Sequence, residues 1–156
     1  MDKKHYSKQR LYTWKELEND VSKLAKEILQ KYVPEVVLAV AEGGWIPARL
    51  LENCIDAEYF SIGCSYYDKH DSKLDAPLVY QLPSTDNLDD KKVLIIDEVC
   101  ESGSTLRHIS DLLHDYHPKE IRTAVLHKKV SSGFRPDFFI HSVEQEWIIY
   151  PWTSKY

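Results

Sequence analysis

The stretch VLIIDEVCESGSTL, residues 93–106, decides the fold of this chain. It follows the polar run 86–92 and opens with four apolar residues, as is typical of a short strand buried on both faces of a parallel sheet. We expect this strand to end at Asp97. Apolar residues then recur at helical spacing, namely Leu106, Ile109, Leu112 and Leu113. Residues 101–105 are therefore predicted to join the strand to a helix.

The predicted connection has the composition of an anion site. Backbone N–H groups are unpaired at a helix N-terminus, where the helix dipole is positive, and Gly103 lets the backbone approach an anion closely. Hydroxyl donors surround this glycine, namely Ser102, Ser104 and Thr105. Asp97 and Glu98 are acceptor-only groups at the strand end, suited to the vicinal hydroxyls of a ribose. The stretch predicts a ribose 5-phosphate site; an ordinary helix cap is the alternative for a lone Ser-Gly-Ser-Thr turn.

Two acids at a strand end, a third at Glu101 and then Ser-Gly-Ser-Thr resemble the phosphoribosyl pyrophosphate (PRPP) motif of type I phosphoribosyltransferases. The family motif has Thr where this chain has Ser102, which keeps the hydroxyl. The resemblance implies that Asp97 and Glu98 bind the ribose hydroxyls and that residues 102–105 bind the 5-phosphate. It also implies that Glu101 lies near N7 of the base as a catalytic general acid or base, where the family more often has Asp.

Composition fits one globular domain that spans the whole chain of 156 residues. No apolar run approaches membrane-spanning length, and the first ten residues lack a signal-peptide apolar region, so we expect a cytoplasmic protein without a membrane partner. Three cysteines without C-x-x-C spacing fit free thiols, and Cys100 is expected to be a small buried side chain more than a nucleophile. The net charge of −5 argues against nucleic acid and requires Mg²⁺ to accompany an anionic substrate such as PRPP.

A second strand-to-helix connection lies earlier in the chain. Residues 36–40 are predicted to form a buried strand and residues 46–54 a helix. The residues between them are Ala41, Glu42, Gly43 and Gly44. This segment resembles the pyrophosphate loop of the same family, particularly of its small purine enzymes, which commonly have Arg or Lys at the position of Glu42. A carboxylate would repel pyrophosphate, so we expect Glu42 to turn outward or to meet pyrophosphate only through Mg²⁺, with Arg49 or Lys69 supplying positive charge.

The polar stretch 66–75 is predicted to be a mobile loop after a strand at residues 58–65. In the family, a loop at this position folds over PRPP and often carries a Ser-Tyr pair, which Ser65 and Tyr66 match. Closure would exclude water from the reactive ribosyl centre. A solvated hairpin connection is the alternative interpretation.

The C-terminal third carries the residues that resemble a base-binding site. Residues 121–126 are predicted to form a strand, after which the resemblance to xanthine-guanine and hypoxanthine phosphoribosyltransferases makes Lys128 the partner of the exocyclic oxygen of a 6-oxopurine. An ammonium donates hydrogen bonds but accepts none, which excludes a 6-amino group. Trp147 would stack on the purine, with a place in the core as its alternative, and backbone groups near Ile148 would read the edge of the base.

The order of elements predicts an α/β fold, a mostly parallel sheet flanked by helices, with a small C-terminal base-recognition segment. Thr13 and Glu16 form a capping-box pattern at the start of an amphipathic helix. The resemblance implies a homodimeric or homotetrameric enzyme of purine salvage that converts PRPP and a purine base into pyrophosphate and a purine nucleoside monophosphate. Two alternatives stay open, a catalytically weak PRPP- or nucleotide-sensing module and an enzyme that admits water or a non-purine nucleophile.

Overall fold

The computed structural model describes residues 8–67 and 73–153. In chain order, the elements are β1 (Lys8–Leu11), α1 (Trp14–Leu29), β2 (Val36–Ala41), α2 (Trp45–Leu51), β3 (Glu58–Tyr67), β4 (Lys73–Gln81), η2 (Thr85–Asn87), β5 (Lys92–Cys100), α3 (Ser104–Leu113), η3 (His114–Tyr116), β6 (Glu120–Lys129), β7 (Phe138–Val143) and β8 (Glu146–Ile149). Strands and helices alternate through the middle of the chain, which is the pattern of an α/β protein.

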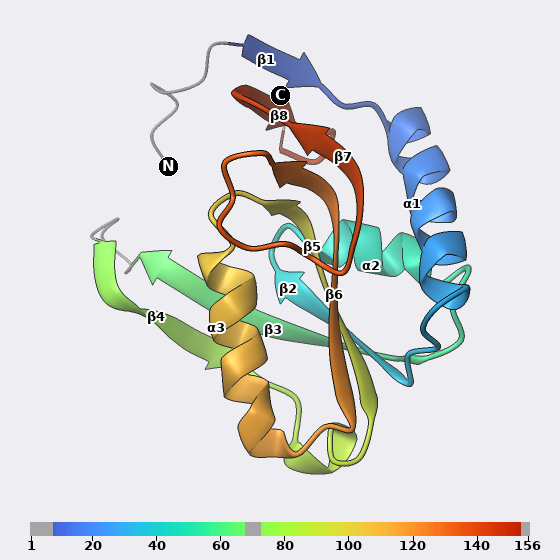
Figure 1. Cartoon of the computed structure of the whole chain (residues 1–156), viewed down its shortest axis with the longest axis vertical. Helices are drawn as coiled ribbons and strands as arrows, with labels where there is room; N and C mark the ends of the chain where they lie inside the picture. The colour runs from blue at the N-terminus through green and yellow to red at the C-terminus, as the bar shows by residue number, and fades with distance from the viewer. Residues whose placement is uncertain (1–7, 68–72, 154–156) are drawn as a thin grey trace.

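A six-stranded sheet in the order β4-β3-β2-β5-β6-β7 forms the centre of the fold (Figure 1). All neighbouring strands in it are parallel except β4, which runs antiparallel to β3. The central strand β2 is buried along nearly its whole length, as is the first half of β5, because helices cover both faces. Their Val, Leu and Ile residues suit such a position. The prediction of a mostly parallel sheet flanked by helices is confirmed.

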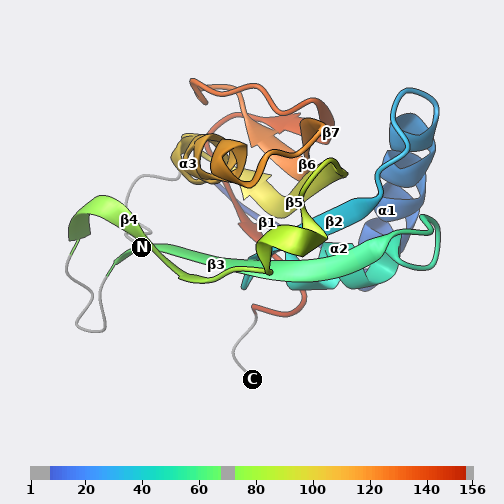
Figure 2. The same cartoon turned by 90° about the horizontal axis from the view of Figure 1, so that it is seen from below.

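Helices α1 and α2 cover one face of this sheet and α3 covers the other (Figures 1 and 2). The chain leaves β2 through α2 to reach β3 on one side, and leaves β5 through α3 to reach β6 on the other side. Because such crossovers are right-handed, opposite directions place the two helices on opposite faces. The carboxyl ends of β2 and β5 therefore flank the point where ligands bind in open α/β sheets.

Helix α1 begins with the predicted capping box. The backbone N–H of Glu16 donates to Thr13 Oγ1 at 3.2 Å, and the backbone N–H of Thr13 donates to Glu16 Oε2 at 2.8 Å. One face of the helix, including Leu17, Leu24 and Ile28, is fully buried against the sheet. Among the residues that the structure describes, no helix has the length and apolar character needed to cross a membrane.

A second, two-stranded sheet pairs β1 with β8 in parallel, from Lys8 opposite Glu146 to Leu11 opposite Ile149. It lies beyond the carboxyl ends of the central strands (Figure 1). The sequence did not predict β1, which is four residues long, mostly exposed and without apolar alternation. The segment predicted to recognise the base is thus held by the N-terminal part of the chain.

Three strands extend further than the sequence predicted. β5 continues past Asp97 to Cys100, because Val99 and Cys100 still pair with β6. β6 itself continues through Lys129. β3 reaches Tyr67, so the Ser-Tyr pair expected in a mobile loop belongs to a strand, and residues 73–75 of that loop begin β4. The rest of the expected loop, residues 68–72, lies outside the described residues.

Candidate active site

The loop predicted to bind pyrophosphate, which follows β2, meets the end of β5. A Cβ atom built on Gly43 would lie within 3.0 Å of all three atoms of the Glu98 carboxylate, closer than real Cβ atoms approach. Gly44 is buried beside the same strands, and its N–H donates to Val40 O at 2.8 Å. The absence of a side chain at Gly43 therefore makes the space that the acid occupies. The predicted pyrophosphate loop and the predicted ribose acids form one site.

The two acids at the end of β5 lie side by side. The backbone N–H of Glu98 donates to Asp97 Oδ1 at 2.8 Å, which fixes the Asp97 carboxylate. Burial, and then the neighbouring Glu98 carboxylate, raise the pKa of Asp97 well above its usual range. A crowded carboxylate pair of this kind is stabilised by donors or by a cation. It can accept hydrogen bonds from two neighbouring hydroxyls or take part in binding a divalent metal.

The loop after β5 is shaped by Gly103, which precedes the first residue of α3 and has φ +83°. A side chain there would be strained, and its Cβ would also lie within 3.0 Å of Phe134 Cβ. Ser102 and Ser104 are exposed, with their hydroxyls 2.9 Å apart, and the N–H of Ser104 donates to Ser102 Oγ at 3.2 Å. Helix α3 starts at Ser104, two residues earlier than predicted, so Thr105 lies in its first turn. Hydroxyls and the helix N-terminus together form an anion cradle.

A cavity of about 200 Å³ opens beside these acids. It is lined by Glu98, Val99, Glu101, Lys129, Trp147, Ile148, Tyr150 and Thr153. Three of the residues predicted for the base, Glu101, Trp147 and Ile148, are therefore brought together. The cavity joins the end of β5 to the C-terminal segment, and an indole and aliphatic groups share its wall with carboxylates and an ammonium. Such a mixed wall suits a flat polar ring.

The lysine in the wall of this cavity is Lys129, and the structure does not bring Lys128, the lysine predicted to contact the base, to this wall. Successive side chains of a strand point to opposite faces, and β6 continues through both residues, so the two lysines cannot face the same side. Lys128 Nζ instead donates to the backbone carbonyl of Lys129 at 2.9 Å. Lys129 Nζ donates to the carbonyl of Glu146. Burial lowers the pKa of Lys129, against the attraction of the Glu101 and Glu146 carboxylates.

The charges expected around the pyrophosphate loop are arranged differently. Glu42 is exposed at the start of this loop. Arg49, one of the two cations expected to compensate for Glu42, forms an ion pair at 3.0 Å with Glu52 on the same side of α2. Lys69, the other, lies outside the described residues. The described residues therefore give Arg49 a carboxylate partner outside the pyrophosphate loop.

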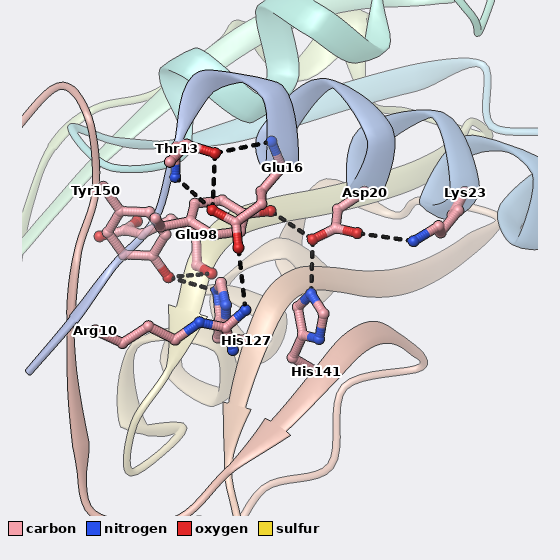
Figure 3. A network of polar contacts seen from close by, with 10 residues as sticks. Arg10, Thr13, Glu16, Asp20, Lys23, Glu98, His127, His141 and Tyr150 are labelled. Carbon is pink, nitrogen blue, oxygen red and sulfur yellow. Dashed lines mark hydrogen bonds and ion pairs between the residues drawn. The ribbon is translucent and has the colours of Figure 1, made fainter. Parts of the chain in front are cut away.

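A cluster of polar side chains contacts the backbone of Glu98, and the sequence did not predict it (Figure 3). Tyr150 donates its hydroxyl hydrogen to the backbone carbonyl of Glu98 at 3.0 Å, and His127 Nδ1 lies 3.0 Å from the same hydroxyl. The His127 ring stacks on that of His141, whose Nε2 is 2.6 Å from Asp20 Oδ2. Burial lowers the pKa of His127 to about 3. The run of aromatic residues near the C-terminal end of the sequence was the one sign of this cluster.

Cys100 is nearly fully buried, with Sγ 3.2 Å from Ser132 Oγ. Burial raises the pKa of this thiol, which keeps it protonated. The residue is a packed core side chain, as the sequence led us to expect.

The parallel sheet, the two loops at its switch point and the cavity beside them define a type I phosphoribosyltransferase fold. The family model described as "Phosphoribosyl transferase domain" matches residues 7–155. The chain belongs to the phosphoribosyltransferase family, which confirms the resemblance seen in residues 93–106.

Relatives of known name or structure agree with this assignment. A xanthine-guanine phosphoribosyltransferase of Gluconobacter oxydans is 27% identical over 144 residues, which cover 91% of this chain and 83% of the relative. A solved xanthine-guanine-hypoxanthine phosphoribosyltransferase of Helicobacter pylori is 28% identical with a TM-score of 0.80, covering 93% of this chain and 94% of the other. A Neisseria gonorrhoeae protein solved with bound ppGpp is 28% identical with a TM-score of 0.79, covering 96% and 92%.

Proposed function

We propose that this protein transfers the 5-phosphoribosyl group of PRPP to a 6-oxopurine base and releases pyrophosphate. The observation that carries the proposal is the cavity that joins the acids of β5 to Trp147, Ile148 and Lys129. It adjoins the loops suited to a phosphorylated ribose, so a ring in the cavity would lie next to a sugar on the loops. The family membership and the names of the relatives support a role in purine salvage.

Each wall of the cavity has a distinct role in holding the base. The indole of Trp147 offers a face for stacking, which is worth about 1 kcal/mol beyond the area that it buries. The ammonium of Lys129 donates to the 6-oxo group, and it rejects a 6-amino group because it has no acceptor. The backbone at Ile148 reads the edge of the ring. Together these contacts select guanine, hypoxanthine or xanthine over adenine.

The ribosyl half of the reaction uses the two loops. Asp97 and Glu98 accept hydrogen bonds from the ribose hydroxyls, and residues 102–105 donate to the 5-phosphate. Pyrophosphate leaves toward the loop at Gly43, a residue that places no side chain of its own in the site. Holding both substrates in this geometry supplies most of the rate enhancement, because no covalent intermediate is needed.

Mg²⁺ is the expected cofactor. The described residues contain no cluster of three or more His, Cys, Asp or Glu side chains that could hold a metal ion alone. Asp97 and Glu98 fit a Mg²⁺ ion that arrives with PRPP, since this ion prefers oxygen ligands from one or two carboxylates and from substrate phosphates. When bound, Mg²⁺ supplies positive charge for the leaving pyrophosphate.

Glu101 manages the proton of the base. Its side chain lines the cavity, so it reaches the ring from the side of β5. A carboxylate there accepts the proton that the purine loses when its nitrogen attacks the anomeric carbon, which is the role of a general base. Water admitted to the cavity is the other acceptor available for this proton.

A regulatory nucleotide-binding module is the second candidate. Two observations favour it: the similar Neisseria gonorrhoeae protein was solved with ppGpp, and Glu42 brings negative charge to the pyrophosphate loop. A module of this kind would bind PRPP or a phosphorylated nucleotide without efficient turnover.

The deciding experiment measures pyrophosphate release with Mg²⁺ and PRPP in the presence of guanine, hypoxanthine, xanthine, adenine or no base. Release that depends on a 6-oxopurine, together with the matching nucleotide, supports the proposed enzyme. Equal release without a base indicates that water attacks the ribosyl centre. Saturable binding of PRPP or ppGpp without release under any condition supports the regulatory module and rejects the enzyme.

A further inference from the structure

Tyr150 and His127 form a buried pair beside Glu98 (Figure 3). Tyr150 is 4% exposed and His127 is 0% exposed. The Tyr150 hydroxyl is 3.0 Å from the backbone carbonyl of Glu98 and 3.0 Å from His127 Nδ1. A buried hydroxyl with two partners is held firmly, because moving it would leave polar groups unsatisfied.

The direction of both hydrogen bonds follows from counting hydrogens. The carbonyl oxygen of Glu98 only accepts, so the single hydroxyl hydrogen of Tyr150 points to it. His127 Nδ1 must then be the donor to the hydroxyl oxygen, which fixes the tautomer of the imidazole. His127 Nε2 has no hydrogen-bond partner within the described part of the chain, so the contact with Tyr150 is the one that orients this ring by hydrogen bonding.

The carbonyl that Tyr150 holds belongs to the acid that faces the pyrophosphate loop. The backbone N–H of Glu98 is already bound to Asp97, and its carboxylate lies against Gly43. Tyr150 thus fixes the remaining backbone polar group of Glu98. Because the N–H and the carbonyl of Glu98 are both hydrogen-bonded, the Tyr150 hydroxyl and the strand β5 together set the direction of the Glu98 side chain.

The same tyrosine belongs to the wall of the base cavity. It follows β8 by one residue and lines the cavity together with Trp147 and Ile148. Its ring stacks on that of Trp152 with the centroids 4.8 Å apart. A ligand that packs on this wall therefore contacts the ring whose hydroxyl is bonded to the carbonyl of Glu98.

We infer that Tyr150 is a positioning residue that couples the base cavity to the ribose site through the carbonyl of Glu98. This inference rests on the proposed function and deepens it, because it makes occupation of one half of the site strengthen the other. The effect is reciprocal by linkage: a purine in the cavity tightens binding of the ribose phosphate by the same factor as the ribose phosphate tightens binding of the purine.

The test compares Tyr150→Phe with Tyr59→Phe in the full-length chain. The control is matched, because Tyr59 also donates its hydroxyl to a backbone carbonyl, that of Ile55 at 3.1 Å, far from the site in β3. Calorimetry measures the dissociation constant of ribose 5-phosphate with and without guanine, a pair that cannot react because ribose 5-phosphate carries no pyrophosphate. Steady-state kinetics give KM for PRPP and kcat separately.

In the parent protein and in Tyr59→Phe, guanine should tighten binding of ribose 5-phosphate. In Tyr150→Phe, the tightening should disappear, and KM for PRPP should rise about three- to tenfold, the size expected for one lost neutral hydrogen bond. The value of kcat should change less, since the reacting groups remain. Retention of the tightening and of KM for PRPP in a folded Tyr150→Phe protein overturns the inference.

A double variant separates positioning from stability. Tyr150→Phe leaves both the His127 donor and the Glu98 carbonyl without their partner, whereas Tyr150→Phe combined with His127→Leu removes the unsatisfied donor and leaves the carbonyl alone. The double variant should recover part of the thermal stability that Tyr150→Phe loses but none of the coupling between the ligands, and recovery of the coupling overturns the inference. A parent protein that couples the ligands without turnover would refute the proposed enzyme and leave the coupling intact.

Discussion

Adding a single methyl group at Gly43 should lower the activity of the protein while leaving its stability nearly unchanged. In Gly43→Ala, the new Cβ atom would lie within 3.0 Å of the carboxylate of Glu98. These atoms are the far end of a flexible side chain, so the carboxylate can rotate aside while the backbone of β2 and β5 stays in place. We therefore expect the free energy of unfolding to change by less than about 1 kcal/mol, the usual range for a relieved contact.

The activity of Gly43→Ala should fall because Glu98 is moved away from the ribose. A hydrogen bond to a charged group is worth about 1.5–3 kcal/mol, and each 1.4 kcal/mol is about a factor of ten, so kcat/KM for PRPP should drop roughly 10- to 150-fold. The assay is pyrophosphate release at saturating purine, with urea unfolding of the same samples. Gly133→Ala is the control, since a Cβ there would meet nothing within 4 Å.

Two outcomes of this experiment would refute the reasoning. One is a folded Gly43→Ala protein whose kcat/KM for PRPP stays within about twofold of the parent value, a change too small for a lost charged hydrogen bond. The other comes from the double variant with Glu98→Gln. If both substitutions act on the same carboxylate, their effects should not add. Full additivity would mean that Gly43 acts by another route.

Three further predictions follow from the same geometry. Gly44→Ala should lower both the thermal midpoint and the activity, because its Cβ would lie 2.7 Å from a backbone oxygen of β2, which cannot rotate away as a carboxylate can. Circular dichroism melts measure the midpoint, and an unchanged midpoint would contradict this prediction. Lys129→Met should lower kcat/KM for 6-oxopurines by about tenfold or more, the size expected for one lost charged hydrogen bond. In Lys128→Met, kcat/KM should stay within about twofold of the parent value, a change smaller than one hydrogen bond. The reverse order of effects would make Lys128 the residue that contacts the base. Between pH 7 and pH 5, the unfolded state takes up a proton at His127 and the native state, in which the His127 pKa is about 3, does not, so the free energy of unfolding decreases as the pH is lowered. His127 should account for about 2 kcal/mol of this decrease, measured by urea unfolding at each pH. The decrease should be absent in His127→Leu and kept in His114→Leu, a substitution at an exposed site.

Local patterns in the sequence were sufficient for the central elements. The apolar run before Asp97 predicted a buried strand, and the Thr13 capping box predicted the start of α1. Each of these signals lies within a few residues, so it does not depend on distant contacts. The two glycine-containing connections could also be recognised, because an anion loop at a helix N-terminus needs small and hydroxyl residues nearby.

Features that depend on pairing between distant segments were not predictable. β1 has no periodicity of its own and exists as a strand because β8 lies beside it. The length of β6 decides whether Lys128 or Lys129 faces the cavity, and that length depends on pairing with β5 beyond its apolar part. The contact between Gly43 and Glu98 likewise arises from the neighbourhood of β2 and β5 in the sheet. The sequence gives the residue types, but the face of the sheet to which each side chain points and the residues that it contacts depend on how the strands pair.

The pairing of β1 with β8 has a consequence for how the protein is made. Lys8 leaves the ribosome long before its partner Glu146 is added. The nascent chain can assemble β2, β3 and β5 during synthesis, whereas β1 must wait until residues 146–149 are available. Pairing across so much of the chain is slow, because a long loop has to close first. The central sheet is therefore expected to form before the wall that carries Trp147, and the protein becomes competent to hold a base only after β1 and β8 have paired.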